Sequence, residues 1–131
     1  MRYLLDTVIF LWSLDAQRNL NDRALAILQN RQEEVFLSPV VTWEMVIKVA
    51  CGKLKLSRPP DDIVQRAFTE FRTRALPITH SHSLAVAQLP PLHSDPFDRM
   101  LVAQARSEKM VLMTADPILE KYPVETLWCG R

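Results

Sequence analysis

One stretch of the sequence, HSDPFDRMLVAQA (residues 93–105), has the pattern of a helix start followed by a buried helix face. Asp95 directly before Pro96 is an N-cap residue followed by proline at the first helical position, where a missing N–H costs nothing. Apolar residues then recur at helical spacing, at Phe97, Met100, Leu101 and Ala105. Asp98 falls in the first turn, where an acid interacts favourably with the helix dipole. The stretch therefore predicts a capped helix with two carboxylates at its start.

On both sides of this helix, short apolar runs alternate with helical patterns. Strands are expected at residues 2–6, 34–38, 75–78, 110–114 and 125–128. Near-continuously apolar strands that alternate with helices are typical of a parallel sheet covered by helices on both faces. The sequence shows no repeat, no low-complexity segment and no internal boundary. We therefore expect an α/β protein in which residues 1–131 form a single domain.

Helix-start signals recur along the chain. Asn21 can cap a helix, and the Ser38-Pro39 pair has the same cap-plus-proline signature as Asp95-Pro96. After a proline-rich loop, Asp61 or Asp62 is expected to begin a helix. Its expected buried stripe consists of Ile63, Val64, Ala67, Phe68 and Phe71. Further helices are expected over residues 81–89 and, as a short last helix, from Asp116-Pro117 onward.

Composition excludes several classes of protein. Only 2 of 131 residues are glycine, and neither GxGxxG nor GxxxxGK[ST] occurs, so a glycine-rich phosphate loop is excluded. The formal net charge is +1, from 16 basic and 15 acidic residues. A protein that binds nucleic acid by charge alone is usually far more basic. If this chain binds RNA, metal ions or a local basic patch must supply the positive field.

The N-terminus and the cysteines indicate a cytoplasmic protein. Asp6 follows the initial residues too early for a signal peptide, and no apolar run reaches the roughly 18 residues needed to span a membrane. We therefore expect no membrane association. Cys51 and Cys129 have no metal-ligand spacing, so reduced thiols are expected.

Acidic residues lie where the carboxyl edge of the predicted sheet should be. Asp6 ends the first strand, Asp116 follows the strand at 110–114, and Asp98 opens a helix. In open α/β sheets, ligands bind beyond the carboxyl ends of the strands, where the strand order reverses. Two carboxylates about 4 Å apart repel by roughly 4 kcal/mol at an effective dielectric constant near 20. A hard divalent cation, Mg²⁺ or Mn²⁺, is expected to relieve this repulsion.

Each acid also has a structural alternative. Asp95 and Asp116 are natural N-caps, and Asp98 suits the helix dipole. Glu44 has Lys48 four residues later, in the favourable orientation for a helical ion pair, although its helix face is otherwise apolar. A purely structural role is least expected for Asp6, because a charged residue that ends an apolar strand usually has a function.

Other polar and aromatic groups leave alternatives open. Lys48, Lys53, Lys55 and Arg58 form either a solvated helix end or a patch that guides phosphates. The three histidines His80, His82 and His93 are possible metal ligands or proton shuttles, and for His93 the favoured interpretation is a hydrogen-bonding group that fixes its loop. The large aromatic residues are expected in the core or at an interface, with base stacking as the alternative; they are Trp12, Trp43, Phe97 and Trp128.

Four segments of the chain, in order, resemble the PIN-domain toxins of VapBC-type toxin–antitoxin modules. They are Tyr3–Thr7, Trp43–Leu54, His93–Ala105 and Leu112–Asp116. The resemblance spans essentially the whole chain. It implies a three-layer α/β/α sandwich of the PIN type, with a central parallel sheet in the order 3-2-1-4-5.

The resemblance also implies a Mg²⁺-dependent endoribonuclease, the toxin of a type II module. The metal-binding and catalytic acids of the family correspond to Asp6, Glu44, Asp98 and Asp116. Residues expected to contact substrate or to support these acids are Thr7, Asp95, Arg99, Thr114 and Lys48. A cognate antitoxin and a homodimer are implied as partners. One departure is visible, since Val8 stands where many relatives have histidine.

Other functions of α/β proteins with acidic sites would require different residues at these positions. A haloacid-dehalogenase-type phosphatase needs a second Asp two residues after Asp6, where Val8 stands. A phospho-acceptor receiver needs an Asp after the third strand, where Thr79 and His80 stand. A catalytically silent PIN-fold module that only binds proteins is the remaining alternative. Stabilisation by Mg²⁺ distinguishes it, because a binding-only domain should show none.

Overall fold

The sheet of the protein has five short strands, which all run parallel. The computed structural model describes all 131 residues. The strand order is β3-β2-β1-β4-β5, and every neighbouring pair is parallel. The strands are β1 (Arg2–Leu5), β2 (Glu34–Leu37), β3 (Arg74–Ala75), β4 (Val111–Thr114) and β5 (Thr126–Trp128). The parallel α/β class and the strand order implied by the resemblance are confirmed.

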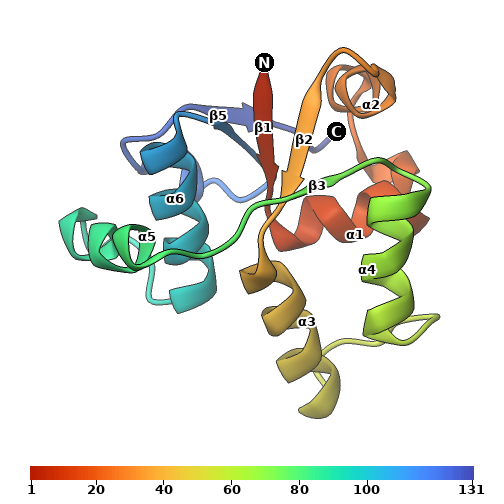
Figure 1. Ribbon diagram of the computed structural model, residues 1–131, viewed down its shortest axis with the longest axis horizontal. Coiled ribbons are helices and arrows are strands. Elements are labelled where there is room, and N and C mark those ends of the chain that lie inside the picture. Colours follow the sequence, from red (N-terminus) through yellow and green to blue (C-terminus); the bar gives the residue numbers. More distant parts are fainter.

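Six α-helices and three short 3₁₀ segments connect the strands. The α-helices are α1 (Thr7–Asp15), α2 (Asp22–Gln29), α3 (Pro39–Ala50), α4 (Pro60–Thr69), α5 (His80–Ala85) and α6 (Pro96–Glu108). The 3₁₀ segments are η1 (Gln17–Asn19), η2 (Val86–Gln88) and η3 (Leu119–Lys121). In Figure 1, α5 and α6 lie to one side of β1, and α1, α2 and α4 lie to the other. None of the helices combines the length and apolarity that a membrane crossing requires.

Side-chain caps decide where most helices begin. Asp6, Asn21, Ser38, Thr79 and Asp95 each accept a hydrogen bond from a backbone N–H in the first turn of the helix that follows. The exception is α4, which begins at Pro60 without a side-chain cap, so the prediction of a start at Asp61 or Asp62 was wrong. Both acids lie instead in its first turn, where the dipole favours them.

The core lies between the central strands and the helices packed on them. It contains 28 buried hydrophobic residues, and Leu4, Leu5, Leu112 and Met113 of the two central strands are almost completely buried. Burying one such side chain contributes roughly 1.5–3 kcal/mol. The expected stripe of α4 is only partly confirmed. Ile63 and Ala67 are buried, whereas Phe68 and Phe71 remain 40% and 38% exposed, because α4 ends at Thr69 and packs on the core with one narrow face only.

Three predicted elements are shorter or irregular. The strand expected at 75–78 is only Arg74–Ala75, an edge strand paired with β2 alone, and Pro77 has no N–H to extend the pairing. The helix expected over 81–89 changes into η2 after Ala85. The last helix begins at Leu119 as a 3₁₀ turn rather than directly after Asp116.

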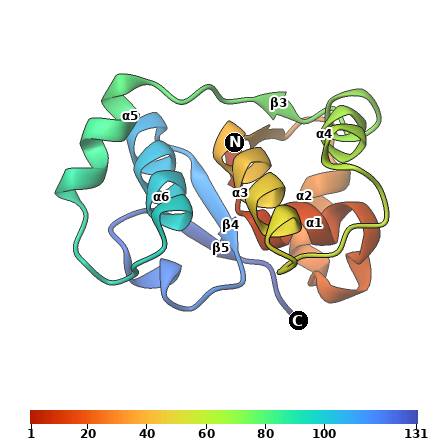
Figure 2. The same cartoon turned by 90° about the horizontal axis from the view of Figure 1, so that it is seen from below.

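The topology brings distant acids to one edge of the sheet. β1 lies between β2 and β4, and Leu5 pairs with Met113 in the parallel register. Asp6, the residue after β1, therefore lies level with Thr114, the last residue of β4, and the N–H of Asp6 donates to the carbonyl of Met113 (3.1 Å). Helices α3 and α6 contact each other and lie side by side in Figure 2. Both begin beyond this same edge.

Candidate metal centre

Asp6 joins the first strand to the first helix and is almost completely buried, at 4% exposure. Its Oδ1 accepts from the N–H of Ile9 (2.9 Å), so the carboxylate caps α1. Burial raises the pKa of Asp6 to about 6. Hydrogen bonds from Thr114 and Ile9 oppose this rise in pKa, while the charges of Asp116 and Glu44 add to it. A buried carboxyl that faces two other acids is typical of a functional site.

Asp98 lies in the first turn of α6 and faces the same acids. Burial, followed by the negative charges of Asp95, Glu44, Asp6 and Asp116 in that order, raises the pKa of its carboxyl to about 7. The charges of Glu44, Asp6 and Asp116 come from other segments of the chain, whereas Asp95 lies in the same segment as Asp98. The four acids that the sequence singled out, Asp6, Glu44, Asp98 and Asp116, therefore lie close enough for the other three to raise the pKa of Asp98. Of these acids, only Asp98 and Asp116 belong to the group of possible metal ligands within 4.8 Å of one another, which His93 completes.

Asp116 is held by the backbone that follows β4. Its N–H donates to the hydroxyl oxygen of Thr114 (3.0 Å), and its Oδ1 accepts from the N–H of Ile118 (2.9 Å). Its other carboxylate oxygen, Oδ2, lies 3.5 Å from Nε2 of His93. Asp116 is thus oriented by a turn rather than by a helix cap, and one of its oxygens faces the cluster.

His93 enters the acid cluster from the loop before α6. Its Nε2 lies 3.2 Å from Oδ2 of Asp98, and one ligand atom from each of His93, Asp98 and Asp116 lies within 4.8 Å of the others. The backbone N–H of Asp95 donates to Nδ1 of His93 (3.3 Å), which confirms that His93 helps to fix its loop, as predicted. The contact of His93 with the acids agrees with the less favoured alternative, a possible ligand or proton shuttle, but its partners were not predicted. No spacing rule in the sequence points to it, because Asp116 belongs to another strand-end turn.

Glu44 projects from α3 and is held by two partners. Its side chain is buried, at 3% exposure. The hydroxyl of Thr7 donates to Oε1 at 2.5 Å, and the ammonium group of Lys48 contacts Oε2. The hydrogen bond to Glu44 raises the pKa of Lys48, burial opposes the rise, and the charges of Glu44, Asp95 and Asp98 add to it. Lys48 therefore lies in the field of Glu44, Asp95 and Asp98.

The remaining candidates have local structural contacts. Asp95 caps α6 by accepting from the N–H of Phe97 (2.9 Å). The guanidinium of Arg99 donates to the carbonyl of Pro90 (2.9 Å) and to the hydroxyl of Tyr122 (3.3 Å). These contacts fix the loop between η2 and α6.

The donor set fits a hard divalent cation. Ligand atoms of His93, Asp98 and Asp116 lie within 4.8 Å of one another, and the charges of Asp6 and Glu44 also act on Asp98. Burial, and after it the mutual repulsion of the acids, raises the pKa values of Asp6 and Asp98. Oxygen ligands with few nitrogens suit Mg²⁺ or Mn²⁺, and a bound cation would relieve the repulsion. No cysteine belongs to the cluster of possible metal ligands.

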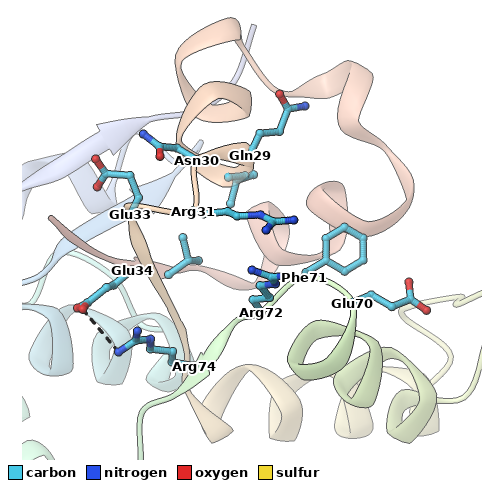
Figure 3. Close-up of a pocket in the computed structure, with 11 residues that line it drawn as sticks. Gln29, Asn30, Arg31, Glu33, Glu34, Glu70, Phe71, Arg72 and Arg74 are labelled. Atoms are coloured by element: carbon cyan, nitrogen blue, oxygen red, sulfur yellow. Dashed lines mark ion pairs between the residues drawn. The ribbon is translucent and has the colours of Figure 1, made fainter.

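A pocket of about 360 Å³ lies elsewhere, at the opposite edge of the sheet (Figure 3). Glu34 and Arg74, which begin β2 and β3, form an ion pair of 3.5 Å in its wall. The charges of the residues that line it are balanced, because there are as many arginines as glutamates. They are Arg31, Arg72, Arg74, Glu33, Glu34 and Glu70. None of the clustered acids lines this pocket.

The fold and the cluster define an α/β protein with acidic side chains gathered where its parallel strand order reverses. The chain belongs to the PIN domain family, whose model matches residues 3–125. PIN domains are generally nucleases, and PIN nucleases use divalent metal ions. The comparison with curated proteins finds no match.

Solved structures share the fold along almost the whole chain. VapBC2 from Rickettsia felis, bound to a DNA fragment from its promoter, is similar with a TM-score of 0.73 and 15% identity, over 99% of this chain and 100% of that chain. DNA-bound VapBC from Salmonella typhimurium gives a TM-score of 0.66 and 14% identity, over 97% of both chains. FitAcB from Neisseria gonorrhoeae gives a TM-score of 0.60 and 21% identity, over 96% of both chains.

Proposed function

We propose that this chain is a Mg²⁺- or Mn²⁺-dependent endoribonuclease and the toxin of a type II toxin–antitoxin module. The observation that carries the proposal is that Asp98 and Asp116, from two segments of chain, lie against the same nitrogen of His93 (3.2 and 3.5 Å), while the charges of Asp6 and Glu44 act on Asp98. Membership of the PIN domain family supports nuclease chemistry. The fold shared with VapBC complexes supports the toxin assignment.

In this proposal the four carboxylates hold the divalent ion, and His93 borders it through Asp98 and Asp116. A bound ion supplies Lewis-acid activation of water and neutralises phosphodiester charge. The chain itself orients the carboxylates. The N–H of Ile9 fixes the Asp6 carboxylate, and the Thr7 hydroxyl fixes that of Glu44. Because these contacts exist before substrate binds, the acids need little reorganisation during the reaction.

The partners and organisation belong to the same proposal. We infer one PIN domain over residues 1–131, acting in the cytoplasm, with an antitoxin and a second copy of the chain as partners. The similar structures are toxin–antitoxin complexes. On α3, Trp43, Val46 and Val49 are 58%, 48% and 37% exposed, and such an apolar face is typical of a protein interface. Sedimentation of Trp43→Glu against the unmodified chain tests the dimer, which this change should dissociate.

Cleavage of total cellular RNA with and without EDTA tests the activity. We expect fragments with Mg²⁺, no fragments with EDTA, and no fragments from Asp6→Asn at any Mg²⁺ concentration. The matched control is Asp61→Asn, an exposed acid in the first turn of α4, which should cut like the unmodified chain. Thermal melting establishes that both variants fold. Cleavage by Asp6→Asn at the normal rate, or absence of both cleavage and Mg²⁺ stabilisation in the unmodified chain, would refute the proposal.

A further inference from the structure

A second pocket, of about 390 Å³, lies beside the acid cluster. Two indole rings and two guanidinium groups line it, from Trp12, Trp128, Arg18 and Arg131. No Asp or Glu is among its lining residues. The pocket is therefore aromatic and carries two guanidinium groups, of which that of Arg131 lies 3.7 Å from the exposed carboxylate of Asp22, and it adjoins the acid cluster.

The pocket and the acids share the same edge of the sheet. Ala115, in the pocket wall, directly precedes Asp116. Trp128 ends β5 next to the end of β4, because Thr114 pairs with Trp128 in the parallel register. Beyond this pair, the N–H of Cys129 donates to the carbonyl of Thr114 (2.9 Å). A ligand bound in the pocket therefore lies immediately next to the metal centre.

Hydrogen bonds hold the pocket wall in place. The side-chain amide of Asn21 donates to the carbonyls of Trp128 (2.9 Å) and Gly130 (3.3 Å), and its N–H donates to the carbonyl of Cys129 (2.8 Å). The guanidinium of Arg131 donates to the carbonyl of Arg18 at 2.8 Å. The last segment of the chain is therefore fixed against α2 and η1.

Gly130 brings the backbone close to the indole ring. A methyl group placed on Gly130 would lie 3.4 Å from the Nε1 of Trp128 and 3.4 Å from the Cβ of Ala115. The residue thus packs tightly beside the ring while adding no side chain to the pocket. Trp128 as a whole residue is 38% exposed, so part of this large residue remains available to a ligand.

Flat rings beside cations suit an unpaired nucleotide. Bases of single-stranded nucleic acid stack on exposed aromatic side chains, and arginine attracts the neighbouring phosphates. We propose that this pocket binds an unpaired base of the RNA strand, one or two nucleotides from the phosphodiester at the acid cluster. The base stacks on the exposed Trp128 ring, with Trp12 in the adjoining wall, and Arg18 and Arg131 attract the backbone. This inference rests on the proposed ribonuclease function.

Binding of a labelled single-stranded RNA pool, about 12 nucleotides long and of random sequence, tests the pocket. Fluorescence anisotropy is measured in the Asp6→Asn background, which keeps the RNA intact. We expect Trp128→Leu to weaken binding roughly tenfold and Trp128→Phe to retain most of it, because phenylalanine still offers a stacking face. The matched control is Phe68→Leu on α4, an aromatic ring of similar exposure (40%), which should bind normally.

Two further measurements separate stacking from a folding defect. AMP should shift the indole N–H resonances of Trp12 and Trp128 and leave that of Trp43 unchanged. Arg131→Gln should lower the slope of log affinity against log salt by about 0.7. The pocket is refuted if Trp128→Leu binds RNA like Phe68→Leu, if AMP shifts only Trp43 or no indole, or if no RNA binding is detected. If the unmodified chain still cuts RNA with Mg²⁺ in those cases, the proposed function is retained and only the proposal of a base-binding pocket is refuted.

Discussion

The Nε2 atom of His93 lies 3.2 Å from Oδ2 of Asp98, which links the loop before α6 to the first turn of that helix. The same nitrogen lies 3.5 Å from Oδ2 of Asp116. One imidazole thus holds together two acids that come from different strand connections. Because the orientation of metal-binding carboxylates depends on such contacts, His93 should matter for metal affinity.

We expect His93→Ala to weaken Mn²⁺ binding by roughly tenfold or more, since Asp98 and Asp116 lose their shared partner. Isothermal titration with Mn²⁺ measures the change. His80→Ala, at an exposed position at the start of α5, is the control and should bind normally. Equal Mn²⁺ affinity in the two variants would mean that His93 only fixes its loop.

The acid cluster should make stability fall as pH rises when a chelator is present. Burial raises the pKa of Asp6 to about 6 and that of Asp98 to about 7, from the ordinary 3.8. Between the ordinary and the raised values, the folded protein binds more protons than the unfolded chain. The free energy of unfolding therefore decreases as pH rises through this window.

We expect the melting temperature in EDTA to be higher by roughly 5 °C at about pH 5 than at about pH 8. Asp98→Asn should reduce this difference, because one of the two carboxyls with a raised pKa is removed. Mg²⁺ should raise the melting temperature most at the higher pH, where the carboxylates are ionised and bind the cation. A melting temperature that rises steadily with pH in EDTA would show that the acids do not share one buried cluster.

Lys48 should stabilise the fold by neutralising a buried acid. Its ammonium contacts Glu44, whose other partner is the hydroxyl of Thr7. We expect Lys48→Met to lower the free energy of unfolding by about 1 kcal/mol, a modest value because the Lys48 side chain is 38% exposed. Urea denaturation at neutral pH measures this loss in the free energy of unfolding. Lys53→Met, at an exposed lysine without an ion pair, should change stability little, and an equal loss there would refute the role of Lys48.

The two thiols should differ in reactivity. Cys51 is exposed, whereas Cys129 is fully buried and donates to the carbonyl of Leu127 at 3.3 Å. Burial, aided by the charge of Asp6, raises the pKa of Cys129 to about 12. A thiol reagent should therefore modify only Cys51 in the folded protein and both thiols after denaturation. Rapid modification of Cys129 under native conditions would contradict the placement of the last segment.

Local signals predicted most of the elements, and long-range pairing decided the exceptions. The caps at Asn21, Ser38 and Asp95 are read directly from the sequence, because capping involves only neighbouring residues. The length of β3 is different, since an edge strand extends only as far as its neighbour and Pro77 allow. Exposure of Phe68 likewise depends on how α4 packs, which periodicity does not reveal.

The sequence by itself determined which chemical groups are available and roughly where each lies relative to a strand or helix end. It therefore predicted the parallel α/β class and the candidate acids, among them Asp6 and Asp98. Only the tertiary structure decided that His93 faces two of these acids and that Trp12 and Trp128 share a pocket beside them. The reason is physical. Helix caps and strand runs depend on bonds between near neighbours in the chain, whereas these contacts join segments whose approach is fixed by sheet order and packing.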